Sequence, residues 1–374
     1  MTKLAISLFL LHLISLPFTR AGLYTAFSTT GHIPFSDTTL PVDWSAKLKV
    51  DVTVNSFASS AQLFRPEVDT GTCGFLFASK DLSDWNPATE ALETNKGWQF
   101  LSSSDLLYTG HWVTRDLYFN PRSSTTRTRS TVPILAVTKK VKCSSYNVAL
   151  DNDTCPTAPE WTDTNPSVRL MGIGFGRELD GQPQGTPDKN AFINIQSIAG
   201  QSMGSHIQGY TIDSNGINVG LTDANTLGMT FQDLPARNPN PPVSRIPTVP
   251  RDWASLRSNC ISFNDGISCH SGEVLLDTGI GNSSMRVPLG VTIPRDATTK
   301  VLNDGAIVKV NLGDLPLVVE RFVAGTGAAT TVTPDFAFAY NSDRGNFFNT
   351  GRHVYRAWRT AFDSVNGRFG MVAV

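Results

Sequence analysis

The sequence predicts a mainly β protein built from two parts. Short stretches alternate apolar and polar residues with the period of two that is typical of half-buried strands. Helical periodicity is confined to residues 351–359 and, more weakly, to residues 188–198. Six prolines crowd residues 235–250, which therefore cannot form a central strand and are the expected linker between the parts. The clearest strand patterns lie at residues 48–54, 217–219 and 306–312.

Length and charge exclude some classes of protein. A chain of 374 residues has room for two or three domains. The 31 Lys and Arg residues nearly balance the 32 Asp and Glu residues, so the net charge is −1. Nucleic acid is therefore not the expected ligand, because its binding requires a basic surface.

The first 21 residues have the pattern of a secretory signal peptide. Lys3 precedes an apolar run at residues 4–16, and Pro17 and the small residue Ala21 follow it. The run is too short to cross a bilayer, which takes about 20 residues. We expect a secreted, extracellular or vacuolar/lumenal protein without a membrane span. Its expected parts are an N-terminal region at 22–234, the linker at 235–250 and a C-terminal region at 251–374.

The cysteines are consistent with an oxidising compartment. Cys143 lies close to Cys155 in sequence, and Cys260 lies close to Cys269. Proximity favours these two disulfides, although four cysteines allow three connectivities. Cys73 is left over and is expected to be a buried, unreactive thiol.

A glycosylation sequon begins at Asn152 and ends at Thr154, in a polar segment. We therefore predict a glycoprotein carrying a glycan at Asn152.

Each part of the chain contains one Asp-Thr-Gly sequence that follows a strand-forming run. The first is Asp69-Thr70-Gly71-Thr72 and the second is Asp277-Thr278-Gly279. A single copy indicates only a turn, because Asp and Gly are good turn formers. Two copies, one in each part, indicate paired carboxylates. Two carboxyl groups about 3 Å apart share one proton, so that one can activate water while the other protonates a peptide carbonyl oxygen.

The sequence resembles the pepsin-like aspartic peptidases, and the likeness extends beyond the two turns. Leu170-Met171-Gly172 resembles the element that passes behind the first aspartate loop, and residues 209–220 are similar to the strand pair closing the first lobe. Residues 351–370 resemble the closing segment of the family, with Phe362-Asp363 ending a strand. Residues 108–116 are similar to the flap hairpin.

The resemblance implies a bilobal pepsin-like acid protease fold with an active-site cleft between two β lobes. It implies a secreted aspartic endopeptidase, a monomer that binds extended polypeptide and needs no cofactor or metal. The residue roles that it implies are a catalytic dyad (Asp69 and Asp277), a cross-loop contact (Thr70 and Thr278), close backbone approaches (Gly71 and Gly279), a supporting hydroxyl (Thr72) and a flap (Tyr108 and Gly110).

Three departures from the family pattern favour a second hypothesis. Ile280 stands where the family has a hydroxyl residue, and Asn349-Thr350 stand where two apolar residues precede the glycine. The interval between Gly22 and Asp69 leaves little room for an inhibitory prosegment. The alternative is a non-proteolytic pepsin-like protein that binds peptide, glycan or a protein partner in the cleft.

Other chemistries are less well supported by the sequence. The pattern Gly200-Gln-Ser202-Met-Gly204 matches the nucleophile elbow of serine hydrolases, which needs a helix after the serine, and residues 204–209 form a poor helix. The histidines show no metal-ligand spacing, so no metal site is expected.

Overall fold

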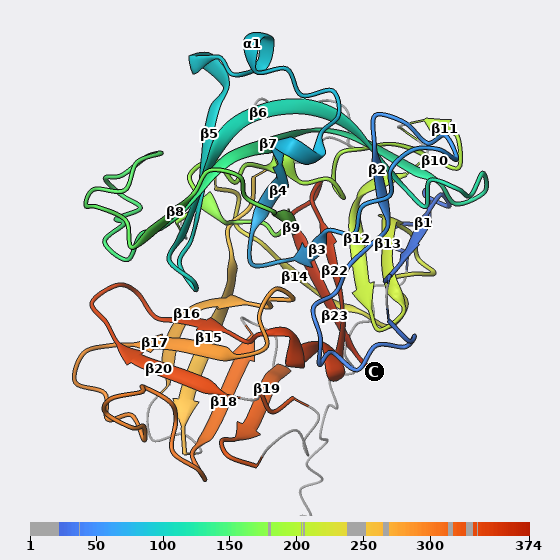
Figure 1. Cartoon of the computed structure of the whole chain (residues 1–374). Coiled ribbons are helices and arrows are strands. Elements are labelled where there is room, and N and C mark those ends of the chain that lie inside the picture. Colours follow the sequence, from blue (N-terminus) through green and yellow to red (C-terminus); the bar gives the residue numbers. More distant parts are fainter. Residues whose placement is uncertain are drawn as a thin grey trace, which may run out of the picture.

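The structure is a computed structural model that describes residues 22–36, 38–178, 181–202, 204, 206–237, 252–264, 269–312, 317–326, 332–334 and 336–374. The expected signal peptide and residues 238–250 of the expected linker lie outside these residues. The described chain is mainly β, as predicted, and its strands form three sheets (Figure 1).

A curled ten-stranded sheet forms most of the N-terminal part in the described residues. The long strands β6 and β7 pair along their whole length at its centre. The strands are β2 (Val52–Val54), β3 (Glu67–Asp69), β4 (Cys73–Ala78), β5 (Lys96–Leu101), β6 (Leu106–Phe119), β7 (Thr128–Lys142), β8 (Trp161–Asp163), β9 (Arg169–Ile173), β10 (Ile195–Ile198) and β11 (Gln201–Ser202).

A second curled sheet of seven strands forms the C-terminal part of the described chain. The order across this sheet is β19-β18-β15-β16-β21-β17-β20. The strands are β15 (Leu256–Phe263), β16 (His270–Leu275), β17 (Ser283–Val287), β18 (Ile307–Leu312), β19 (Leu317–Val323), β20 (Ala337–Asn341) and β21 (Phe347–Asn349).

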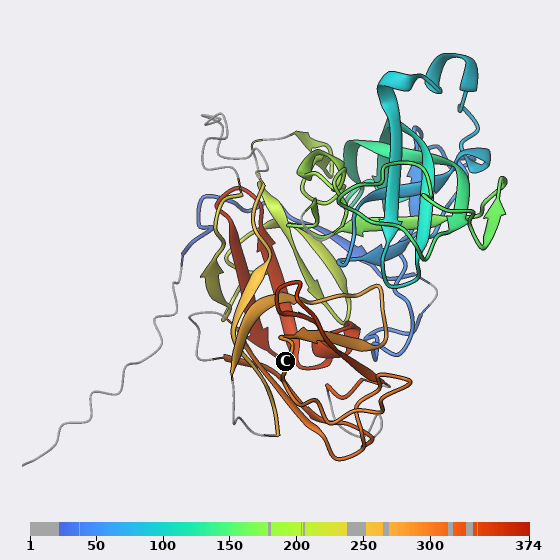
Figure 2. The ribbon, with the colours of Figure 1, turned by 90° about the vertical axis from the view of Figure 1, so that its left-hand side faces the viewer.

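The third sheet joins the two parts. Its order is β1-β13-β12-β22-β23-β14, and Figures 1 and 2 show its red C-terminal strands beside the yellow-green strands β12 and β13. The predicted C-terminal region 251–374 is therefore divided, because its last two strands pair with strands from 22–234. The strands are β1 (Gly31–Pro34), β12 (Ile207–Asp213), β13 (Gly216–Leu221), β14 (Thr230–Asp233), β22 (Trp358–Asp363) and β23 (Arg368–Ala373).

Helices in the described chain are short. They are η1 (Ser79–Asp81), α1 (Pro87–Glu90), η2 (Glu93–Asn95), η4 (Pro187–Lys189) and η6 (Arg352–Arg356). The helix expected at 351–359 is limited to η6, because β22 takes up the following residues in the shared sheet. The weaker expectation at 188–198 is wrong beyond η4, since residues 195–198 pair with β7 as strand β10.

Parallel strand pairs position both Asp-Thr-Gly turns. Strand β3 runs parallel to β9 and ends at Asp69, which lies in register with Gly172. Strand β16 runs parallel to β21, and its last residue, Leu275, lies opposite Asn349. Each turn therefore leaves the end of a strand that has a parallel neighbour, and the strands fix the direction in which the turn projects.

One hydrophobic core continues through all three sheets. It includes Val68 from the first sheet, Ile212 from the shared sheet and Val274 from the C-terminal sheet, all at least 98% buried. The rings of Phe175 and Phe362 stack at 4.1 Å and connect the segment after β9 to the shared sheet. Because the core is continuous, the two parts hold one another in position.

Both disulfides favoured by sequence proximity are present. Cys143 is bonded to Cys155, and Cys260 to Cys269. Cys73 is free and buried, as expected. Disulfides are typical of proteins from oxidising compartments. No helix within the described ranges is long and apolar enough to cross a membrane.

Glu320 is a buried carboxylic acid in β19. Its side chain is 1% exposed, and neither carboxylate oxygen has a hydrogen-bond partner among the residues that the structure describes. It lies opposite Val310 of β18, itself fully buried. Burial raises the pKa of Glu320 well above its ordinary value. The folded state therefore favours the protonated form of this side chain.

We predict that Glu320→Gln reduces the pH dependence of stability. A carboxyl group whose pKa is raised by folding contributes its full stability below its ordinary pKa, and this contribution is lost as the pH rises toward the raised pKa. Unfolding in urea at about pH 4 and at neutral pH, which bracket carboxyl titration, measures the difference. That difference should shrink because Gln does not titrate, by about 1.4 kcal/mol for each unit by which folding raises the pKa of Glu320. An equal difference in both proteins contradicts the prediction.

Candidate active site

The two Asp-Thr-Gly turns meet through reciprocal hydrogen bonds between their threonines. The backbone N–H of Thr70 donates to Thr278 Oγ1 at 3.1 Å, and the N–H of Thr278 donates to Thr70 Oγ1 at 2.9 Å. Each hydroxyl then donates across the junction, from Thr70 to the Leu276 carbonyl at 2.6 Å and from Thr278 to the Val68 carbonyl at 2.9 Å. These four bonds lock the turns together.

The two carboxylates lie against the glycines of the opposite turns. A Cβ added to Gly71 would be 2.5 Å from Asp277 Oδ2, and one added to Gly279 would be 2.5 Å from Asp69 Cγ. Any side chain at either glycine would displace a carboxylate. Each glycine also binds its own aspartate, since Gly71 N–H donates to Asp69 Oδ1 at 2.6 Å and Gly279 N–H donates to Asp277 Oδ1 at 2.8 Å.

The pair is almost fully buried, and its members interact. Asp69 is 8% exposed and Asp277 is 5% exposed. Burial raises the pKa of Asp69 well above its ordinary value, and the charge and hydrogen bond of Asp277 raise it further. The arrangement therefore favours a single proton shared by the pair.

Asn349 supports Asp277 in a way that the sequence did not predict. Its Nδ2 donates to Asp277 Oδ2 at 2.7 Å, while its Oδ1 accepts from Gly351 N–H at 2.9 Å. Ile280 offers no hydroxyl, so this amide supplies a donor to the carboxylate from strand β21. The signal in the sequence was the polar residue at a position where the family pattern has an apolar one.

Thr72, which the resemblance gives as a supporting hydroxyl, has a different environment. Its side chain is 3% exposed, and within the described part of the chain its Oγ1 has no hydrogen-bond partner. The two carboxylates are therefore supported unequally, with a side-chain amide at Asp277 and no hydroxyl bond from Thr72 at Asp69.

Two buried arginines donate hydrogen bonds to the carbonyl oxygens of the turn glycines. Arg177 Nε donates to the Gly71 carbonyl at 2.9 Å, and Arg352 Nη2 donates to the Gly279 carbonyl at 3.2 Å. Gln182 Nε2 also donates to the Gly71 carbonyl, at 3.1 Å. With each carbonyl held from behind, the glycine N–H groups stay directed at the carboxylates. These positioning residues carry no motif in the sequence, and only the fold brings them to the turns.

The predicted flap residues lie in strand β6. Tyr108 is 7% exposed and packs in an apolar cluster with Leu76, Leu135 and Leu170. Burial raises the pKa of its phenol to about 12. A Cβ on Gly110 would lie 2.0 Å from the Ala136 carbonyl oxygen, so the close approach of β6 to β7 requires glycine there. Sheet packing explains both residues, and their flap role stays a prediction.

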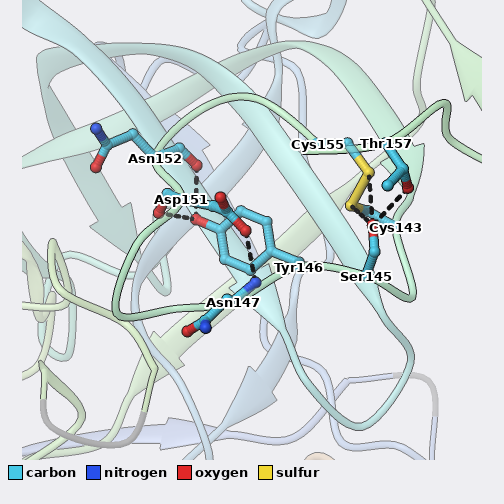
Figure 3. The surroundings of a disulfide bond; sticks show 8 residues. All are labelled: Cys143, Ser145, Tyr146, Asn147, Asp151, Asn152, Cys155 and Thr157. Atoms are coloured by element: carbon cyan, nitrogen blue, oxygen red, sulfur yellow. Dashed lines mark hydrogen bonds between the residues drawn. A yellow bond between two sulfur atoms is a disulfide. The ribbon is translucent and has the colours of Figure 1, made fainter.

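The predicted glycosylation site lies in the loop closed by the first disulfide (Figure 3). Asn152 is exposed, and its side chain points away from the ring of Tyr146. Tyr146 Oη donates to the Asp151 and Asn152 carbonyl oxygens at 2.9 and 2.6 Å, which fixes the loop backbone. The amide of Asn152 is therefore accessible on a structured loop, as a glycan acceptor requires.

The structure gives little support to the other candidate sites, which are a serine nucleophile, a cysteine nucleophile and a metal site. Ser202 is exposed in the two-residue strand β11, and β12 rather than a helix is the next described element. Burial raises the pKa of the Cys73 thiol to about 12, which disfavours a thiolate nucleophile. Among the described residues, no group of three His, Cys, Asp or Glu side chains could hold a metal ion.

Together, the fold and the paired turns define a two-part β protein with a buried carboxyl dyad at the junction of its parts. No family model matches this chain, and the search of curated proteins finds no match either.

We predict that Thr278→Val destabilises the protein by about 2–6 kcal/mol. The substitution keeps the side-chain shape but leaves Thr70 N–H and the Val68 carbonyl buried without partners, each at a cost of about 1–3 kcal/mol. Thr278→Ser keeps the hydroxyl and is the matched control. Urea unfolding of the three proteins measures the difference, and equal stability of the Val and Ser variants would show that the junction does not depend on these bonds.

Proposed function

We propose that this chain is a secreted aspartic endopeptidase that hydrolyses peptide bonds at acidic pH. The observation that carries the proposal is the reciprocal threonine contact that holds Asp69 and Asp277 against the glycines of the opposite turns. Two buried carboxyl groups with one shared proton provide an acid and a base at a single point. The two disulfides and the signal-like first 21 residues support a secretory route.

The environments of the two aspartates suggest different roles. Each aspartate accepts a hydrogen bond from the glycine N–H of its own turn, and Asp277 also accepts one from Asn349 Nδ2. In the proposed mechanism Asp277 is the base that takes a proton from the attacking water. Asp69, whose pKa is raised, is the acid that protonates the carbonyl oxygen of the scissile bond. The resulting tetrahedral diol then collapses with proton transfer to the leaving amine.

We predict that Asp277→Asn abolishes acid-dependent cleavage of denatured protein. The amide cannot accept the proton of water, so the expected loss of kcat is at least about 100-fold, the lower range for general acid–base catalysis. Asp343→Asn is a matched control, because Asp343 is exposed and lies outside the turns. Peptide release between about pH 3 and 7, which brackets dyad titration, measures the effect, and a statine-type inhibitor should block it. Undiminished cleavage by the Asp277→Asn variant would contradict the proposed function.

The unpartnered hydroxyl of Thr72 favours the second candidate function, a non-proteolytic protein that binds a ligand between its two parts. Without a hydroxyl bond from Thr72 or from residue 280, the dyad has fewer donors than the family pattern supplies. Saturable peptide binding without any turnover by the unmodified protein over the same pH range would favour this function over hydrolysis.

We predict that Asn349→Leu lowers kcat and moves the acid limb of the pH–activity profile to higher pH. Without the amide donor, the singly ionised state of the aspartate pair is less stable. The pair therefore loses its first proton at a higher pH. Asn349→Gln can keep a donor and should lie between Leu and the unmodified protein. A fall in kcat with an unshifted profile would indicate only a packing role for Asn349.

A further inference from the structure

A cavity of about 730 Å³ opens between the two parts of the chain. The β5–β6 hairpin and the loop after Cys143 line it on the N-terminal side, with Phe100 and Tyr146 among the lining residues. Strands β15, β16 and β17 and the turn before β21 line it on the C-terminal side. The cavity therefore has one wall from each part, as a binding site at the junction requires.

Strand register places three lining residues of the C-terminal wall, Arg257, Glu273 and Arg286, in one row with Phe347, which does not itself line the cavity. Arg257 lies opposite Glu273, Glu273 lies beside Phe347, and Phe347 lies opposite Arg286. Residues paired directly across neighbouring strands project from the same face of a sheet. The guanidinium carbon of Arg286 lies 4.7 Å above the centre of the Phe347 ring, which fixes its position in the row.

This wall has an excess of positive charge. Arg257, Arg286 and Arg344 line the cavity, and Glu273 is the carboxylate among the lining residues. Arg257 and Arg344 are exposed, and in the described chain neither forms an ion pair. Guanidinium groups bind carboxylates through paired N–H donors. The wall is therefore suited to a ligand that brings a carboxylate.

The N-terminal wall contributes apolar side chains beside the polar Ser102 and Asn147, and a disulfide constrains the loop that carries part of it. The rings of Phe100 and Tyr146 stack at 4.3 Å, and Val148 lines the cavity beside them. The Cys143–Cys155 disulfide closes the loop that carries Tyr146, and Figure 3 shows the tyrosine hydroxyl tied to the loop backbone. A wall that is ordered before binding lowers the conformational cost of binding a ligand.

We propose that this cavity is a subsite that binds an acidic side chain of an extended polypeptide, next to an apolar side chain on the other wall. Strand β16 and the residues after it connect Glu273 to Asp277, four residues later. At about 3.3 Å per strand residue, the Cα atoms of Glu273 and Asp277 lie within roughly 13 Å of each other, a span of about four residues of an extended peptide. This inference rests on the proposed function for its ligand class.

The two walls favour peptide over an acidic oligosaccharide. A glutamate beside a leucine supplies both the carboxylate and the apolar surface that the walls match. An oligosaccharide of uronic acids supplies carboxylates but no aliphatic side chain to pack against Val148 and the stacked rings of Phe100 and Tyr146. Phe100 and Tyr146 stack on each other, which occupies one face of each ring.

The test measures binding without relying on cleavage. The Asp277→Asn protein is titrated with a short labelled peptide containing Glu next to Leu, and with the same peptide containing Gln in place of Glu. The Glu peptide should bind more tightly, and the preference should weaken in high salt. Arg257→Gln combined with Arg344→Gln should weaken binding of the Glu peptide about tenfold, in line with two exposed charge pairs, and leave the Gln peptide unchanged.

Arg122→Gln is the matched control, because Arg122 is also exposed but does not line this cavity. Equal affinity for the Glu and Gln peptides overturns the inference, and so does tight binding of a uronic-acid oligosaccharide with no binding of the Glu peptide. Failure of the proposed function has a different signature. In that case the unmodified protein cleaves nothing at acidic pH, while the Glu peptide still binds and still depends on Arg257 and Arg344.

Discussion

The reciprocal hydrogen bonds between Thr70 and Thr278 are the contact on which the rest of the site depends. Each threonine accepts a backbone N–H from the other turn and donates to the carbonyl of the residue just before the aspartate of that turn, so neither turn is complete alone. The glycines that follow can then approach the opposite carboxylates, which brings Asp69 and Asp277 together in a buried position. The shared sheet and continuous core keep this junction rigid.

The dyad is asymmetric because its two surroundings differ. Each aspartate accepts a hydrogen bond from the glycine N–H of its own turn, but in the described chain only Asp277 also accepts one from a side-chain amide, that of Asn349. Burial and the charge of Asp277 raise the pKa of Asp69. Two carboxyl groups in equal surroundings would have no preferred acid and base. The unequal support therefore gives a direction to the proton transfers that we propose.

Much of the framework followed from local patterns. Alternating residues predicted strands such as β13 and β18, and proximity predicted both disulfides. The helix predicted from periodicity at residues 188–198 is wrong beyond η4, because pairing of β10 with β7 outweighs the local helical preference. The predicted parts 22–234 and 251–374 did not include the shared sheet. The pairing of β12 with β22 cannot be recognised from the sequence of either strand by itself.

The sequence by itself determined the residue types of the site. Two Asp-Thr-Gly turns behind apolar strands define where carboxylates and close backbone approaches occur, because only glycine leaves room at the third position. Tertiary structure alone decided that Asn349 replaces a missing hydroxyl, that Arg177 and Arg352 hold the turns from behind, and that arginines line the cavity between the parts. These contacts join residues from separate strands and loops, and their distances depend on packing rather than on any local pattern.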